Sequence, residues 1–424
     1  MLLRFYLLLM QALTPAAEDN GKVLRYENYI YEDNIRTVQF LQKGTQYPVP
    51  LIKIGNSDRL TLSFDELGTE NDYYQYTLIH CDAYWRPSNL RPLEYLEGNN
   101  FEYINDFKYC SNTYQKYVHY SVQVPGTEMR PKFSGNYLLK VYRNFDEEDI
   151  VLTRKLFILD GKASFEVDIH PATLAGSRFS KQEVDLKVKL ENYTVVNPYQ
   201  DLKLVMSQNN RWDNAIGGLA PQFIVGNEYT YNYEKENLFD GGNEFRFCDF
   251  RSLRFFSQNV ESKRFDSLYH LVLKTEEKRG AKAYYQYIDF NGKLVIANKD
   301  GQTDASIDGD YVWVYFKLKS DQEFRTGDLY VYGALSDWRP DPRFKMTYNT
   351  AAKQYEAKVL LKQGYYSYIF ATQNSKTGVM ETIESEGNFM ETENDYYIYY
   401  YCRNQLLDYD ELIGFTAVNS RKGN

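Results

Sequence analysis

The stretch Val184–Leu190, with the sequence VDLKVKL, decides the fold class of this chain. Every second residue in it is apolar, and Asp185, Lys187 and Lys189 stand between the apolar positions. A β-strand directs successive side chains to opposite faces of a sheet, so the alternation predicts a strand with one buried and one solvated face. The same pattern recurs at 60–64, 118–124, 137–141, 202–206 and 229–233. We therefore predict an all-β protein with few short helices.

The composition favours the same class and disfavours nucleic acid as a partner. The chain has 41 Tyr and 25 Phe among 424 residues, and aromatic side chains fit the pleated, half-buried surface of a sheet. Its formal net charge is −9, and no Lys/Arg-rich run interrupts that acidic average. A nucleic-acid surface needs a basic patch, so we expect no nucleic acid to bind.

The length predicts several domains, because 424 residues are too many for one hydrophobic core. Strong turn signals at Asp160-Gly161 and at Asn298–Gly301 separate blocks of strand-like sequence. We predict three consecutive immunoglobulin-like β-sandwich domains at residues 24–160, 161–300 and 301–415. The second is expected to carry the segments QNNRWDNAI (208–216) and GGNEFRFCDFRSLR (241–254).

The N-terminus predicts export. Residues 1–17, MLLRFYLLLMQALTPAA, have an early cation at Arg4, an apolar run and then small residues before Glu18, which is the order of a secretory signal peptide. A buried N-terminal segment is the alternative. No later apolar run is long enough to span a bilayer, so we expect a periplasmic or outer-surface protein without direct membrane insertion.

The sequence does not determine whether the four cysteines are free or paired in disulfides. Cys81, Cys110, Cys248 and Cys402 form no CxxC pair and match no zinc spacing. Cys81 and Cys110 share the predicted first domain and could pair in an oxidising compartment. Free thiols that behave as small apolar residues are the alternative.

No catalytic motif is present in the sequence. His80, His119, His170 and His270 are isolated, and HExxH, GxSxG and phosphate-binding glycine loops are absent. We expect His119 to be structural and His170, which precedes Pro171, to lie in an interdomain turn.

Carboxylates are plentiful, but they form no recognisable site. They group at Asp65-Glu66, at 147–149 and at Glu381, Glu384 and Glu386, and such groups are usually solvated faces and loops. The aspartates at 300, 308 and 310 lack the later glutamate of a calcium loop and are interpreted as turns. We predict no catalytic residue, no cofactor and no metal site, and we expect no small-molecule ligand.

Tryptophans are the main candidates for binding a partner or a sugar. Trp85 and Trp338 both occur in a Trp-Arg-Pro tripeptide, where an indole commonly seals the end of a sandwich. The functional alternative for Trp338 is stacking against a sugar. For Arg211 and Trp212 it is anchoring in a protein interface, where these residue types are enriched. A Trp beside a turn is more often part of a core, so the partner-binding residues stay unassigned.

Residues 208–254, together with several other segments, resemble the plug protein family of the type IX secretion system. The other segments are HCDAYWRPSNL (80–90), NTYQKYVHYSVQVP (112–125), FSGNYLLKVYRN (133–144) and FMETENDYYIYYYCR (389–403). They follow one another in the same order and span most of the chain. The resemblance implies an all-β periplasmic protein of the Bacteroidota that is associated with the outer membrane through a partner.

The resemblance also implies a function. In that family the protein closes the periplasmic end of the outer-membrane barrel through which cargo is exported, so the expected partner is that barrel and no enzyme activity is expected. The alternative is a carbohydrate-binding protein of the cell envelope. Residues 331–370 are similar in order to starch-binding immunoglobulin-like modules, from VYGALSDW to GYYSYIF.

Overall fold

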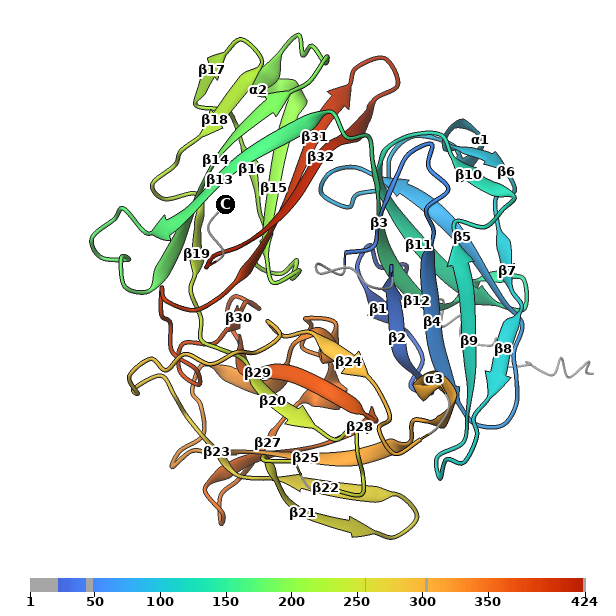
Figure 1. Ribbon diagram of the computed structural model, residues 1–424, viewed down its shortest axis with the longest axis vertical. Helices are drawn as coiled ribbons and strands as arrows, with labels where there is room; N and C mark the ends of the chain where they lie inside the picture. Colours follow the sequence, from blue (N-terminus) through green and yellow to red (C-terminus); the bar gives the residue numbers. More distant parts are fainter. Residues whose placement is uncertain (1–21, 43–48, 256, 302–303, 422–424) are drawn as a thin grey trace, which may run out of the picture.

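β-Strands form most of the regular structure of the protein. The computed structural model describes residues 22–42, 49–255, 257–301 and 304–421, and its strands pack as three two-sheet sandwiches (Figure 1). Three α-helices of four residues each occur in this part of the chain, α1 (Pro92–Tyr95), α2 (Pro198–Asp201) and α3 (Ala305–Asp308). The all-β prediction is confirmed. The predicted signal peptide, residues 1–17, lies outside the described residues.

The first sandwich is formed by residues 29–159. One sheet has the order β1-β12-β11-β5-β7, with β3 beside β12, and the other has the order β2-β4-β9-β8. Side chains from both sheets, such as Phe64, Tyr76 and Leu139, fill one core. The strands are β1 (Tyr29–Ile30), β2 (Ile35–Leu41), β3 (Leu51–Lys53), β4 (Leu60–Leu67), β5 (Tyr74–Cys81), β6 (Leu96–Gly98), β7 (Glu102–Ile104), β8 (Asp106–Tyr109), β9 (Tyr117–Val124), β10 (Met129–Pro131), β11 (Gly135–Arg143) and β12 (Asp146–Leu159).

The second sandwich combines strands from two distant parts of the chain. One sheet has the order β13-β14-β18-β17, with β19 beside β14, and the other has the order β16-β15-β31-β32. The strands are β13 (Ala163–Pro171), β14 (Lys181–Leu190), β15 (Leu202–Gln208), β16 (Ile216–Leu219), β17 (Phe223–Val225), β18 (Glu228–Tyr231), β19 (Leu238–Asp240), β31 (Asp395–Asn404) and β32 (Tyr409–Asn419).

The third sandwich is an insertion between β19 and β31. One sheet is centred on β29, which pairs with β20, β24, β26 and β30, and the other has the order β21-β22-β25-β28-β27, with β23 beside β25. The strands are β20 (Arg246–Asp249), β21 (Val260–Phe265), β22 (Tyr269–Leu273), β23 (Glu276–Glu277), β24 (Leu294–Ile296), β25 (Tyr311–Lys319), β26 (Gly327–Tyr332), β27 (Thr347–Asn349), β28 (Gln354–Lys362), β29 (Gly364–Asn374) and β30 (Met380–Glu381). Two 3₁₀ turns, η1 (Ala334–Ser336) and η2 (Pro342–Phe344), follow β26.

This strand pairing differs from the predicted division at residue 300. The segment 241–254, expected in the second sandwich, contributes β20, which pairs with β29 of the third. The predicted third range, 301–415, includes β31, yet β31 pairs with β15 of the second sandwich along Leu202–Gln208. The boundaries at 300 and 415 are therefore wrong. Turn residues show where a strand ends, but the partner of a strand is set by tertiary packing.

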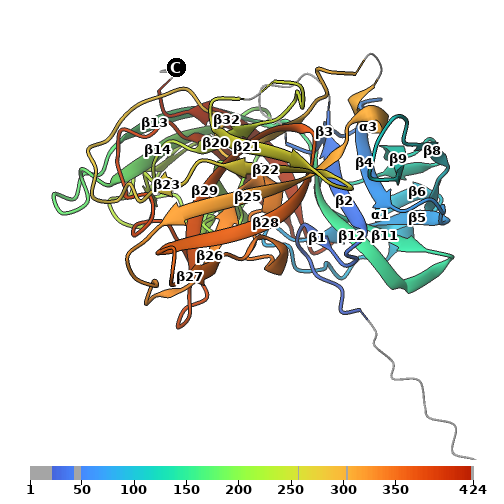
Figure 2. The same ribbon diagram turned by 90° about the horizontal axis from the view of Figure 1, so that it is seen from below.

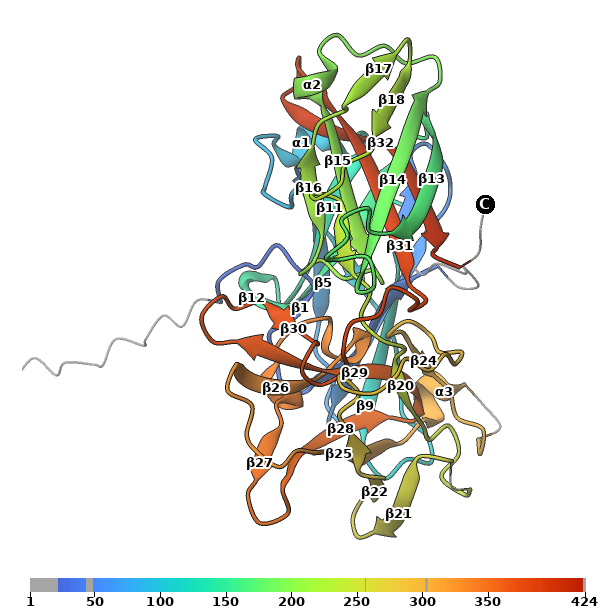
Figure 3. The ribbon, with the colours of Figure 1, turned by 90° about the vertical axis from the view of Figure 1, so that its left-hand side faces the viewer.

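Both faces of β31 are buried, which joins the first sandwich to the second. Tyr396, Ile398 and Tyr400 point into the core of the second sandwich. Tyr397 and Tyr399 point the other way and pack with Leu138 and Phe157 of the first sandwich. Figure 1 shows the first sandwich beside the other two, and Figure 3 shows the second and third arranged end to end.

The segment around residues 240–246 is the crossing from the second sandwich to the third. It runs beside the returning segment around 386–394, and a Cβ on Gly241 would lie 2.0 Å from the carbonyl oxygen of Phe389. The amide of Gly242 donates to Asn388, and the side chain of Asn243 donates to the carbonyl of Glu386. The GGN triplet therefore brings two antiparallel crossings into close contact.

Candidate functional site

Trp212, for which anchoring a partner is the functional alternative to a core role, packs inside the molecule. Its ring lies 5.9 Å from that of Phe157 in a stacked arrangement, and 5.4 Å from the ring of Tyr399. The ring of Trp85 meets it edge-on at 5.6 Å. Trp212 therefore joins the first sandwich to the second, and it is only partly exposed. The sealing role predicted for Trp85 agrees with its 5 % exposure.

Arg211 and Trp338 meet at the junction of the second and third sandwiches. The Arg211 guanidinium is bound by Asp213 and lies 5.4 Å from the ring centroids of both Tyr332 and Trp338. The indole of Trp338 also packs edge-on against Phe245 at 5.9 Å. Arg211 is 9 % exposed, so it is not presented to a partner. Protein groups already contact the Trp338 ring, for which stacking on a sugar is the functional alternative.

A cavity of about 570 Å³ lies where the three sandwiches meet. The first sandwich contributes Asn28 and Lys155 to its lining, the second contributes Trp212, and the third contributes Tyr332 and Trp338. The Lys155 ammonium lies 4.5 Å from the Trp85 ring centroid and 4.1 Å from that of Trp212. These cation–π contacts hold a lysine where water is largely excluded.

Burial lowers the pKa of Lys155 to about 7 from its ordinary 10.5. Below pH 7 the folded protein must carry a buried ammonium, which lowers the free energy of unfolding. This destabilisation decreases as the pH rises from 7 to 10.5. We expect Lys155→Met to raise the thermal midpoint by at least about 2 °C at pH 6 and to have little effect near pH 10.5. The measurement is thermal unfolding across this pH range. The exposed Lys187→Met is the control, and an equal gain at both pH values would contradict the argument.

Two of the carboxylates noted in the sequence, Glu386 and Asp310, bind protein groups. Burial alone would raise the pKa of Glu386, but Arg246 and Arg279 outweigh it and lower that pKa to about 2. Asp310 accepts hydrogen bonds from the amides of Tyr114 and Gln115 of the first sandwich. Asp310 therefore connects the third sandwich to the first, whereas Glu386 binds groups within the third.

Asp65 is the central group of the contact between the first and third sandwiches. One of its carboxylate oxygens accepts from the Lys362 ammonium at 2.6 Å and from the Tyr311 hydroxyl at 2.7 Å. The other oxygen lies 2.6 Å from His119 Nδ1. Asp65 is fully buried and Lys362 is 1 % exposed. This arrangement supports the structural role predicted for His119.

The other histidines also have protein partners. His80 is 1 % exposed and bonds Ser88, and burial lowers its pKa to about 4. His270 bonds the Tyr315 hydroxyl. His170 lies on β13, not in the predicted interdomain turn, because Ala163–Pro171 pairs with β14 along its whole length.

One group of described residues has the composition of a metal site. His170, Glu183 and Asp185 offer ligand atoms within 4.8 Å of one another. Glu183 already accepts from the amide of Thr173, and Asp185 accepts from Asn237. All four cysteines are free, so the optional pairing of Cys81 with Cys110 does not form.

The outer edge of the first sandwich exposes four aromatic side chains, which we call the aromatic edge. Tyr73, Phe101, Tyr103 and Phe145 are 69 %, 39 %, 46 % and 64 % exposed. The ring of Tyr103 contacts Phe101 at 5.6 Å and Phe145 at 5.9 Å, so three of the rings form one chain of contacts. Figure 1 shows β7 on the side of the first sandwich that faces away from the other two. Exposed aromatic groups of this kind favour protein interfaces.

Sequence analysis missed the aromatic edge. Its members come from the turn before β5, from the strand β7 and the residue just before it, and from the turn between β11 and β12. The amide of Phe145 donates to the Gln75 side chain at 2.9 Å, which fixes the last turn. The available signal was the run of aromatic residues in FEYI at 101–104, but nothing in the sequence links it to Phe145.

The fold and these contacts define an all-β protein of three joined sandwiches. Among the described residues, no helix is long and apolar enough to cross a membrane. The model of the first domain of the type 9 secretion system plug protein matches residues 35–160, which is nearly the whole first sandwich.

A solved structure is similar over almost the entire chain. The crystal structure of a hypothetical protein from Parabacteroides merdae has 32 % sequence identity and a TM-score of 0.89, and the match covers 94 % of this chain and 100 % of that chain. Comparison with curated proteins finds no match. The chain belongs to the type IX secretion system plug protein family, whose members serve a secretion apparatus of the cell envelope.

Proposed function

We propose that this protein is a non-enzymatic periplasmic protein that closes the periplasmic end of the type IX outer-membrane translocon barrel. The observation that carries the proposal is the match of residues 35–160 to the first domain of the plug family. The same residues include the aromatic edge, a surface of the kind that binds proteins.

The domain junctions support this function. A protein that covers a wide opening must present a broad surface in a fixed shape. Here, buried and partly buried groups connect each pair of sandwiches: Asp65 with Lys362 for the first and third, Phe157 with Tyr399 for the first and second, and Arg211 with Trp338 for the second and third. The aromatic edge lies apart from all these contacts, so it is free to bind the barrel.

We expect the double substitution Tyr103→Ser and Phe145→Ser to weaken co-purification with the barrel at least about tenfold. Aromatic anchors in an interface commonly contribute about 2 kcal/mol or more. Both side chains are exposed, so thermal unfolding of the variant should match that of the parent. The measurement is affinity purification of the tagged protein from its own cells, with the barrel quantified by mass spectrometry.

The matched control is Leu406→Ser in the second sandwich, where the side chain is 90 % exposed in the turn between β31 and β32. This variant should retain the barrel. Undiminished capture by the double variant would reject the aromatic edge as the binding surface, and absence of the barrel from the parent purification would reject the proposed function. Retention on immobilised α-glucan would favour the carbohydrate-binding alternative.

A further inference from the structure

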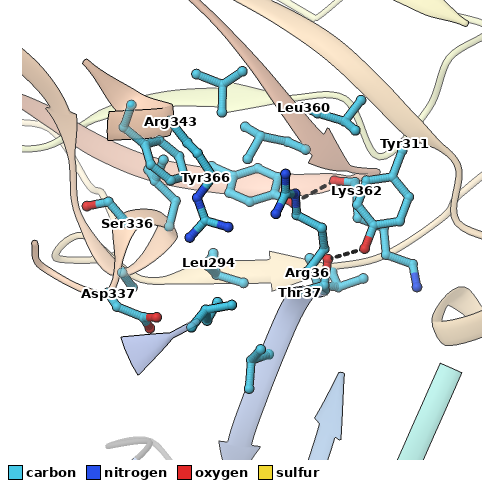
Figure 4. A pocket seen from close by; sticks show the side chains of 18 of the residues that line it. Arg36, Thr37, Leu294, Tyr311, Ser336, Asp337, Arg343, Leu360, Lys362 and Tyr366 are labelled. Atoms are coloured by element: carbon cyan, nitrogen blue, oxygen red, sulfur yellow. Dashed lines mark hydrogen bonds between the residues drawn. The ribbon is translucent and has the colours of Figure 1, made fainter. Parts of the chain in front are cut away.

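A second cavity, of about 270 Å³, lies between the first and third sandwiches. Figure 2 shows these two sandwiches side by side from below, and Figure 4 shows the cavity from close by. Its floor and walls come from β2 on one side and from β24, β25, β28 and the 3₁₀ turns on the other. The cavity reaches the surface, because Lys358 in its lining is exposed.

The strand β2 changes its course at this cavity. Arg36 pairs with Asp65 of β4 and Gln39 pairs with Ser63, so β2 has one extra residue between these pairs. Thr37 in this bulge has a φ of +51°, a left-handed conformation that a β-branched residue rarely adopts. Its hydroxyl is held 2.6 Å from that of Tyr311. The bulge re-aims the side chains beside it, and Figure 4 shows Arg36 extending into the cavity.

Cations outnumber acids around this cavity. Arg154 is 4 % exposed and pairs with Asp337 at 3.1 Å, and Arg343 binds Asp341 through two nitrogens. The Arg36 guanidinium donates to the carbonyl of Ile35 at 3.1 Å, and it has no carboxylate within 4.0 Å among the described residues. Burial, and then the nearby Arg343, lower the pKa of Arg36 against the smaller opposing effects of Tyr311, Asp33 and Asp341.

The remaining walls are apolar. Leu294, Ile296, Leu335 and Phe344 contribute to them, and Tyr366 lies behind with its hydroxyl bonded to the Lys362 carbonyl. A cavity with apolar walls and a few directed polar groups is typical of a small-molecule site. A guanidinium supplies the forked pair of donors that matches phosphate or carboxylate oxygens.

We propose that this cavity binds a small amphiphilic anion, an oxyanion joined to an apolar chain. Arg36 binds the oxyanion, and the apolar walls receive the chain. The site goes beyond closure of the translocon and does not depend on it. It also revises the expectation that the protein has no small-molecule ligand.

The test is calorimetric titration of the purified protein with hexyl phosphate, heptanoate, inorganic phosphate and hexanol. We expect hexyl phosphate or heptanoate to bind at least tenfold more tightly than inorganic phosphate or hexanol, because only these two engage both parts of the site. The tighter of the two identifies the headgroup as phosphoryl or carboxylate. Absence of binding by both, or equal binding of inorganic phosphate, would overturn the proposal.

Arg36→Gln should weaken binding of the tighter amphiphile at least tenfold, while Arg91→Gln, an arginine with an 82 % exposed side chain, should leave it unchanged. Without ligand, Arg36→Gln should not lower the thermal midpoint, because Arg36 has no carboxylate to lose. Arg36→Lys keeps the charge but not the fork and should bind with intermediate affinity, which provides a second test if the glutamine variant folds poorly. Equal affinity in the parent and both Arg36 variants would show that Arg36 is not the binding group.

Discussion

Replacing Asp65 by alanine is expected to lower the free energy of unfolding by about 3–5 kcal/mol. The substitution leaves the Lys362 ammonium, 1 % exposed, without its carboxylate in the contact between the first and third sandwiches. Burial already lowers the pKa of Lys362 against the opposing effect of Asp65. The Tyr311 hydroxyl and His119 lose the same acceptor. Urea unfolding followed by tryptophan fluorescence measures the loss.

Two controls distinguish a buried charge from a generally sensitive position. Asp328→Ala removes an ion pair of similar length, 2.7 Å, whose side chains are about half exposed, and it should cost less than about 1 kcal/mol. The double variant Asp65→Leu with Lys362→Met removes both charges and should recover much of the loss. If the double variant is no more stable than Asp65→Ala, the unpaired lysine is not the cause of the instability.

The local structure of single strands could be predicted from the sequence. In β14, the apolar residues Val184, Leu186, Val188 and Leu190 are buried, while Lys187 and Lys189 are exposed, as VDLKVKL predicts. Alternation predicts which residues of β14 are buried because one face of that strand is exposed to water. β31, with the sequence DYYIYYYC at 395–402, does not alternate because it is buried on both faces.

The pairing of β31 could not be predicted for the same reason. A strand with two apolar faces fits any central position in a sheet, and the sequence places it after the strands of the third sandwich. Its true neighbour is β15, which precedes the entire third sandwich in the chain. Turn signals located the breaks between strands, but long-range pairing determined which strands share a core.

The contacts of the candidate site residues also depend on long-range packing. The sequence leaves Arg211 and Trp212 open between an interface anchor and a core role, and only the structure shows that Tyr332 and Trp338 approach the first and that Phe157 and Tyr399 approach the second. Arg36 had no sequence signal, because its position depends on the bulge in β2 and on residues of the third sandwich.

Replacing Trp212 by alanine should therefore destabilise the protein by about 3 kcal/mol, the lower end of the range for Trp→Ala, because the ring is partly exposed. The loss comes from ring contacts with Trp85, Phe157 and Tyr399, and from the support that Trp212 gives to the Lys155 ammonium. Thermal and urea unfolding measure it.

Trp212→Phe keeps an aromatic ring against Phe157 and should lose less than half as much stability as Trp212→Ala. Tyr199→Ala, which removes a ring that is 59 % exposed, should be close to neutral. The two roles considered for Trp212 predict opposite results for the alanine variant. If Trp212 packs between the sandwiches, the alanine variant loses stability. If Trp212 is a surface anchor, the variant keeps its stability and no longer co-purifies with the barrel. Unchanged unfolding together with lost co-purification would restore the anchor interpretation, and the contacts of Trp212 with three buried or half-buried rings argue for the first result.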